Sequence, residues 1–237
     1  MWKIPSYVVF SHFLKLKHNK MKYYTVKLMT ILFIGLSVMA CKKAENKVEA
    51  TDAEEVTQIE DNATRYMAEV DSSSVNWKGF APTKSHNGTI KISEGYLALN
   101  EGKLIGGNFV IDMKTILNED LESPEWNEKL INHLNSADFF DVDNNPYSVF
   151  AITGVDEIDG KLMVKGNLTV KNIKKNIEFP ATMEMNGEEV ILKSEPFTID
   201  RTEWDVKYNS GKFFEDLKDK LINDEIEFAI EVNAKKS

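Results

Sequence analysis

The chain has 237 residues and a formal net charge of −9, with 42% hydrophobic and 28% charged residues. This acidic balance argues against a nucleic-acid partner, because phosphate recognition requires a basic face, and against electrostatic docking on anionic lipid headgroups. The single cysteine, Cys41, excludes an intramolecular disulfide and a cysteine-rich metal site.

The first 41 residues have the organisation of an export signal. A basic start at residues 21–27 precedes an apolar core at residues 28–37, and a small-residue site ends at Ala40, directly before Cys41. A helix of about 13 apolar residues would span about 20 Å, which is short for a hydrocarbon core of about 30 Å. The order resembles a bacterial lipoprotein signal, so cleavage and acylation of Cys41 are favoured over an uncleaved anchor.

We therefore predict that residues 1–40 are a signal peptide and that acyl chains on Cys41 attach the protein to a membrane. Met21 indicates that residues 1–20 are a product of start-site choice, because signal peptides begin with a short basic segment. Residues 1–40 hold six lysines and no acidic residue, so their removal changes the net charge from −9 to −15. The expected location is the cell envelope, on the outer membrane and facing the periplasm.

Residues 41–64 are polar and nearly free of aromatic side chains. Such a composition buries too little apolar surface to fold. We predict a lipidated flexible tether here, with a short helix near residues 52–59 as the alternative. Residues 65–237 are then long enough for one domain with a single core.

The domain is predicted to be mainly β. Turn dipeptides recur at short spacing, at Asn87-Gly88, Glu94-Gly95, Glu101-Gly102, Asp159-Gly160 and Asn186-Gly187. Between them lie segments of strand length, and the clearest alternation falls in residues 225–232. Further strands are expected at residues 74–80, 89–92, 96–99, 104–113, 147–155, 161–170, 174–185 and 190–199. About eight or more antiparallel strands joined by tight turns indicate a barrel or a sandwich.

Two segments instead have helical spacing. Ser123 and Pro124 suit the N-cap and first helical position, and Trp126, Leu130 and Leu134 then recur every four residues. The second segment, residues 213–221, spaces its apolar side chains similarly, with charged residues between them. Two short helices beside the strands are therefore expected.

No catalytic or metal-binding pattern is found in the predicted domain. His86 and His133 are its only histidines, and neither has a second histidine at ligand spacing. A Gly-x-Ser-x-Gly motif is absent, and Gly106-Gly107 lacks the other residues of a phosphate-binding loop, so this pair is expected to mark a bulge or bend. We predict no catalytic residue and no metal.

The domain resembles the YceI-like family over residues 74–234. The residues that carry the resemblance are Ser74-x-x-Trp77, His86-x-Gly88, Gly106-Gly107-x-Phe109-x-Ile111-Asp112, Leu130-x-x-His133-Leu134-x-Ser136-x-Asp138-Phe139-Phe140-Asp141, Gly166-x-Leu168-Thr169-Val170-Lys171 and Phe197-x-Ile199-Asp200-Arg201-x-x-Trp204-x-Val206-x-Tyr208-x-Ser210-Gly211. The resemblance implies an antiparallel, lipocalin-like β-barrel that binds polyisoprenoid chains, and it supplies no catalytic set. Trp77 stands where a Phe is common and Asn172 where a Gly is common.

The cavity wall is expected to include residues that strand alternation turns inward, and His86 with Lys84 is expected at the barrel mouth. The candidate ligand-binding residues are Trp77, His86, Phe109, Ile111, Phe139, Phe150, Leu168, Phe197, Trp204 and Tyr208. For Asp200-Arg201, a structural ion pair or hydrogen-bonded turn is favoured over a headgroup site. His133 is expected to pack beside the turn that holds Asp138 and Phe139.

The leading hypothesis is a non-enzymatic envelope lipoprotein that holds an isoprenoid-type lipid or quinone and needs no cofactor. The alternatives are a filled barrel that binds other envelope proteins and, less favoured, a lipid-modifying enzyme. A homodimer is left open.

Overall fold

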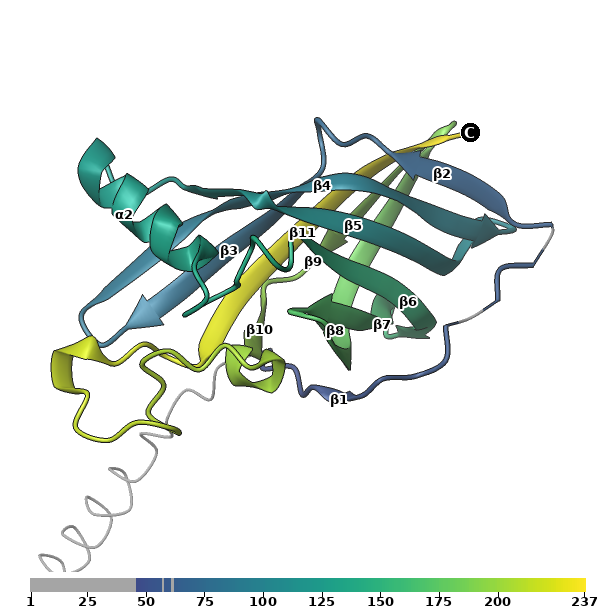
Figure 1. Cartoon of the computed structure of the whole chain (residues 1–237). Helices are drawn as coiled ribbons and strands as arrows, with labels where there is room; N and C mark the ends of the chain where they lie inside the picture. The colour runs from purple at the N-terminus through teal and green to yellow at the C-terminus, as the bar shows by residue number, and fades with distance from the viewer. Residues whose placement is uncertain (1–45, 57, 61) are drawn as a thin grey trace, which may run out of the picture. The chain divides into compact units, whose positions relative to one another are not determined.

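The structure is a computed structural model and describes residues 46–237 except 57 and 61 (Figure 1). The predicted signal peptide and Cys41 lie outside the described residues. No helix in the described part of the chain is long and apolar enough to cross a membrane.

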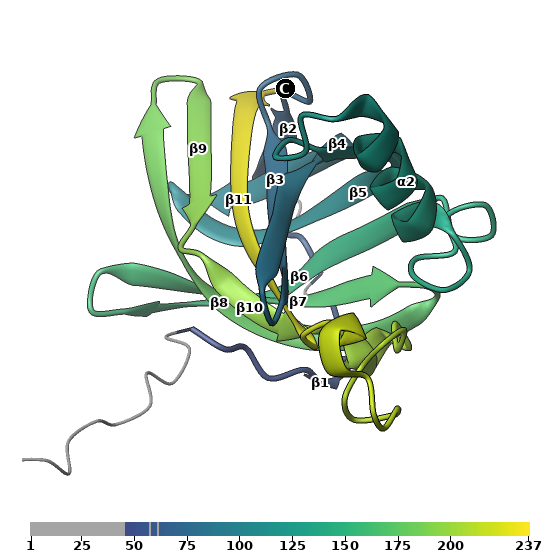
Figure 2. The same cartoon turned by 90° about the vertical axis from the view of Figure 1, so that its left-hand side faces the viewer.

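Eight strands form a closed antiparallel ring within the described residues. Each strand pairs with the next in the series, and β11 pairs with both β9 and β3, which closes the ring. Figure 2 shows these strands curving around a common interior. The sequence prediction of a mainly β, barrel-like fold of about eight strands is therefore confirmed. The ring strands are β3 (Ser74–Ala81), β4 (Lys84–Asn100), β5 (Lys103–Asn118), β6 (Tyr147–Ile158), β7 (Lys161–Val170), β8 (Ile173–Asn186), β9 (Glu189–Ser194) and β11 (Glu225–Lys236).

Two short strands extend the ring along the edges of β11. β2 (Thr64–Ala68) pairs with β11 beyond the end of β3, and β10 (Phe197–Asp200) pairs with β11 beyond the end of β9. The single strand expected at residues 190–199 is therefore broken at Pro196, which has no N–H to donate to a ladder.

The ring has two ends that carry different connections. The β3–β4 turn, the β5–β6 and β7–β8 connections and the segment from β10 to β11 all lie at one end, which we call the near end. The hairpins β4–β5, β6–β7 and β8–β9 turn at the far end, where Gly102, Gly160 and Gly187 have positive φ. The turns predicted at these three glycines are therefore confirmed.

The two other predicted turns are wrong, because Gly88 and Gly95 lie inside β4. A Cβ on Gly88 would stand 1.8 Å from the carbonyl oxygen of Leu117, and one on Gly95 would stand 2.4 Å from the Phe109 ring. Both positions need glycine because a neighbouring strand approaches closely, and neither needs it for a turn.

One of the two predicted helices forms. α2 (Pro124–Asn135) starts with Pro124 after the N-cap Ser123 and buries Leu134. The helix expected at residues 213–221 is wrong. That segment is a loop with one short 3-10 turn, η2 (Lys218–Lys220), and the positive φ angles of Asp216 and Lys218 interrupt any continuous helix. A second 3-10 turn, η1 (Arg201–Trp204), follows β10.

Residues 46–56, which we call the strap, pair with the edges of β10 and β8, so the flexible tether predicted over residues 41–64 is corrected for this part. Val48 is buried, and its N–H donates to the Thr198 carbonyl at 2.9 Å. β1 (Thr51–Asp52) pairs with β8. The helix considered near residues 52–59 does not form in the described part of that range. Main-chain pairing with strands distant in sequence holds the strap where its own composition could not.

Candidate functional site

The interior of the ring holds three apolar cavities in a row. The mouth cavity, about 210 Å³, lies at the near end between the β3–β4 hairpin, α2 and residues 222–223. The middle cavity is about 100 Å³ and the deep cavity about 40 Å³. Neighbouring cavities share wall residues and therefore adjoin. The mouth and middle cavities share Ile90, Phe140, Arg201, Ile226 and Phe228, and the middle and deep cavities share Val75, Ile111, Phe150, Phe179 and Ile230.

Aromatic rings from four strands run through this interior. Phe179 of β8 and Phe197 of β10 stack face to face, with ring centroids 4.5 Å apart and an interplanar angle of 1°. Phe150 of β6 lies 5.5 Å from Phe179, and Phe228 of β11 lies 6.2 Å from Phe197. These ring contacts join strands that are far apart in the sequence.

The structure brings nine of the ten predicted ligand-binding residues to a cavity wall. Trp77, His86 and Phe139 line the mouth cavity. Ile111, Phe150, Leu168, Phe197 and Trp204 line the middle cavity, and Phe109 lines the deep cavity.

Tyr208 is the exception and lines none of these three cavities. Its ring packs edge-on against His133 at 4.6 Å and tilted against Phe139 at 6.0 Å. Its ring thus contacts two residues of the mouth-cavity wall, and His133, for which packing was favoured over contact with a ligand, itself lines that cavity.

Hydrogen bonds fix the two tryptophans of the wall. The indole N–H of Trp77 donates to the Leu117 carbonyl at 3.2 Å, and that of Trp204 donates to the Leu168 carbonyl at 3.1 Å. With their polar atoms satisfied by main chain, both rings present apolar faces to the interior.

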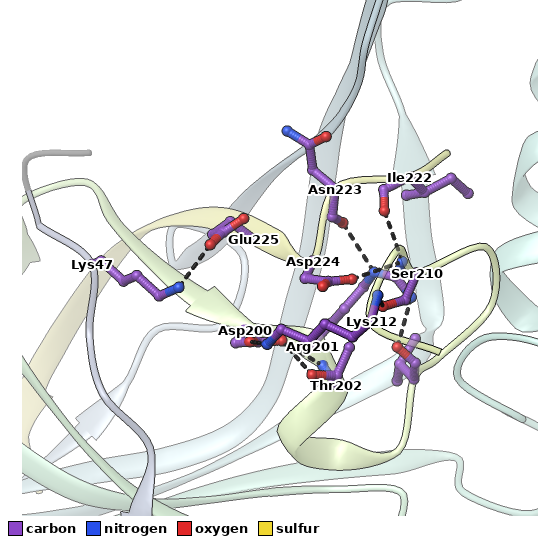
Figure 3. Close-up of polar contacts among 11 residues, drawn as sticks. Lys47, Asp200, Arg201, Thr202, Ser210, Lys212, Ile222, Asn223, Asp224 and Glu225 are labelled. Carbon is purple, nitrogen blue, oxygen red and sulfur yellow. Dashed lines mark hydrogen bonds and ion pairs between the residues drawn. The ribbon is translucent and has the colours of Figure 1, made fainter. Parts of the chain in front are cut away.

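Arg201 is the charged residue at the junction of the mouth and middle cavities, and its side chain is 1% exposed. Its Nε donates to the Asn223 carbonyl at 3.1 Å, Nη2 to the Ile222 carbonyl at 3.1 Å and Nη1 to the Val206 carbonyl at 2.6 Å (Figure 3). The Asp224 carboxylate lies 3.5 Å from Nη2. Burial lowers the pKa of Arg201, and the carboxylates of Asp224 and Asp200 oppose that effect.

Asp200 does not pair with Arg201, its neighbour in sequence. Its carboxylate accepts hydrogen bonds from the Thr202 N–H at 3.0 Å, from the Thr202 hydroxyl at 2.6 Å and from Lys212 (Figure 3). Burial raises the pKa of Asp200, but the hydrogen bonds from Lys212 and Thr202 outweigh burial and hold it below 3.8. The hydrogen-bonded turn predicted at Asp200-Arg201 is therefore present, and the two side chains bind different partners.

His86 lies at the rim of the mouth cavity with Lys84, as expected. Its Nδ1 is 2.8 Å from Asp120, which also accepts from the Asn87 N–H at 2.8 Å and from Asn118 at 2.6 Å. Burial raises the pKa of Asp120, and these hydrogen bonds together lower it below its ordinary value.

Sequence reasoning missed Arg201 as a wall residue, together with Ile90, Phe140, Phe179 and Phe228. The alternation of apolar and polar residues in β11 could have predicted that Phe228 faces the interior. The described residues contain no group of three or more His, Cys, Asp or Glu side chains placed to hold a metal ion. The side chains that line the middle and deep cavities are almost all apolar.

A closed antiparallel ring around adjoining apolar cavities defines the lipocalin-like class of β-barrel proteins. The chain belongs to the YceI-like family, because the YceI-like domain model matches residues 66–234.

Solved structures of low sequence identity to this chain share its fold. Burkholderia cenocepacia BcnA matches with a TM-score of 0.57 and 20% identity, covering 71% of this chain and 99% of its own. A polyisoprenoid binding domain from Saccharophagus degradans, implicated in plant cell wall breakdown, matches with a TM-score of 0.54 and 8% identity, covering 74% of this chain and 99% of its own. No curated protein matches the sequence.

Proposed function

We propose that this protein is a lipid-anchored protein of the cell envelope that binds one long apolar chain, an isoprenoid-type lipid or quinone, inside the ring without converting it. The observation that carries the proposal is the row of adjoining cavities, in which the middle cavity is lined almost wholly by apolar side chains. The family membership and the likeness to a polyisoprenoid binding domain support the same class of ligand.

The apolar wall alone provides enough free energy for such binding. Each methylene moved from water into the interior contributes about 0.8 kcal/mol, so several isoprene units are held without a charged anchor.

The proposed anchor and location rest on the signal-like sequence that ends at Cys41. Acylation of Cys41 would hold the protein on the outer membrane, facing the periplasm, close to a source of apolar lipid. The acidic surface agrees with a protein that depends on its acyl chains for attachment.

Solvent extraction of the tag-free protein purified from its native host, followed by mass spectrometry, tests the proposal. About one isoprenoid-type molecule per chain is expected. Recovery of no stoichiometric apolar compound, together with no uptake of polyprenols or quinones by the purified protein, would overturn it. A filled barrel that binds other proteins would give that negative result, and recovery of a chemically altered lipid after incubation would indicate an enzyme.

A further inference from the structure

The strap fixes the start of the described chain to the near end of the ring. The Asn46 carbonyl accepts from the Thr198 N–H at 3.1 Å, and Lys47 forms a 2.7 Å ion pair with Glu225. Thr198 lies two residues before the end of β10, and Glu225 is the first residue of β11. Both contacts therefore lie beside residues 201–224 at the near end, and Figure 3 shows the pair of Lys47 and Glu225.

Chain length then limits how far this end can lie from the acyl anchor proposed above. Cys41 precedes Asn46 by five residues, which reach at most about 18 Å when fully extended. A free tether of the predicted 23 residues would reach about 80 Å. β4 has 17 residues and is about 56 Å long, so the anchor favours the near end over the far end for contact with the bilayer.

Phe213 and Phe214 stand exposed at this near end. They are 50% and 49% exposed, and the N–H groups of both donate to the Ser210 carbonyl, at 3.1 and 3.0 Å. Ser210 is fully buried, so a fixed turn presents the two rings to the outside. Two adjacent, half-exposed aromatic side chains form an apolar surface whose contact with water is unfavourable, as is typical of a docking site.

The charge around this turn is compatible with a lipid surface. Residues 205–220 hold four lysines and four acidic residues, and Lys207 pairs with Asp205, so this turn is close to neutral in a chain whose net charge is −9. Lys207 Nζ lies 4.9 Å from the centre of the Phe213 ring. Amphipathic contact of this kind, with aromatic rings beside ammonium groups, suits the boundary between headgroups and acyl chains.

We propose that Phe213 and Phe214 insert into the bilayer that holds the acylated Cys41, so that the mouth cavity opens toward the membrane surface. The inference rests on the proposed lipid anchor and adds a docking surface and an orientation to it. A ligand could then pass from the bilayer to the mouth cavity along a short path.

The acylated full chain in phospholipid vesicles provides the test. Acylation consumes the thiol of Cys41, so a Phe213→Cys variant has one thiol for a polarity-sensitive fluorophore. Ile158→Cys is the matched control, because Ile158 is 54% exposed at the far-end β6–β7 hairpin. The label at 213 is expected to emit at shorter wavelength and to be quenched several-fold more by nitroxide lipids than the label at 158.

Equal quenching at both positions, or a water-like signal at 213, overturns the proposal. A blue-shifted label at 213 that lipid nitroxides do not quench also overturns it, because the label then contacts its own chain or a second copy and not the bilayer. Absence of acyl groups on Cys41 removes the argument from chain length and overturns the orientation.

A kinetic measurement separates this inference from the proposed function. The double variant Phe213→Ser/Phe214→Ser is expected to load a polyprenol from vesicles about tenfold more slowly, with unchanged equilibrium binding in detergent, and Ile158→Ser to load at the normal rate. An unchanged loading rate in the double variant contradicts docking. Failure to bind polyprenols or quinones in detergent contradicts the carrier function, and the fluorescence measurement still reports the docking.

Discussion

Asn167 and Glu54 exchange two hydrogen bonds: the Glu54 N–H donates to Oδ1 of Asn167 at 3.0 Å, and Nδ2 of Asn167 donates to the Glu54 carbonyl at 2.7 Å. The side-chain amide thus pairs with the strap as a neighbouring strand would. Asn167 is 3% exposed, and Nδ2 of Asn176 donates to the same Oδ1 at 3.0 Å.

Asn167→Ala is expected to release the strap around Glu54. Both main-chain groups of Glu54 lose their partner and Asn176 loses an acceptor, so the free energy of unfolding should fall by about 2 kcal/mol. Urea unfolding measures the loss, and the Glu54 amide should exchange with deuterium faster. Asn132→Ala, on the exposed face of α2, is the control and should change stability by no more than about 0.5 kcal/mol. Unchanged exchange at Glu54 would contradict this account.

Gly88→Ala is expected to destabilise the protein far more than Gly79→Ala. A methyl group at 88 would meet the Leu117 carbonyl oxygen at 1.8 Å, so β4 and β5 must separate, whereas one at 79 would find no atom within 4 Å. We expect a loss of about 3 kcal/mol or more at 88 and a change below about 1 kcal/mol at 79. Thermal or urea unfolding compares the two, and similar stabilities would refute the close-approach explanation.

The acid stability of the protein should depend on Asp200. Its pKa is lowered in the folded state, so its contribution is fully present above the unfolded value of 3.8 and is lost as the pH falls through the lower folded pKa. The stability difference between the wild type and Asp200→Asn should therefore be constant at neutral pH and shrink below about pH 4. Urea unfolding across this range measures it. Asp143→Asn makes the same charge change at an exposed site and should change the stability less. If the stability of both variants depends on pH in the same way, Asp200 is not the source of the acid sensitivity.

Ile90→Phe should shorten the space available to a ligand. Ile90 is 7% exposed and lines both the mouth and middle cavities, so a larger ring there obstructs their junction. Affinity for a long polyprenol should fall about tenfold or more, affinity for a short isoprenol should persist, and overpacking should cost about 1–3 kcal/mol of stability. Competition binding checks both ligands. Leu117→Phe, on the exposed outside of β5, is the control, and an equal loss for short and long ligands would contradict a continuous cavity.

Local sequence pattern predicted the strands and most of the wall because both depend on alternation. A residue such as Phe150 or Phe197 faces inward once its strand and register are set, and the apolar pattern sets both. Tyr208 follows η1, outside the strands, so alternation gave no valid direction for it.

The errors share a different cause, since each depended on contacts with distant residues. Gly88 is required by Leu117, and Val48 is buried by pairing with Thr198, 150 residues further on. The apolar spacing of residues 213–221 is helical, yet Phe213 and Phe214 have no core to pack against and the segment stays a loop. Arg201 reaches the cavity junction through three carbonyls that no local pattern indicates.

The place of β11 in the chain has a consequence for how the protein matures. β11 pairs with β3 and β2 along one edge and with β9 and β10 along the other, and all four precede it in sequence. A nascent chain synthesised only as far as β10 therefore exposes two open sheet edges, which invite pairing with other chains. The ring can therefore close only late in biogenesis. This order favours a chain that remains unfolded, or is protected by a chaperone, until its last strand is available.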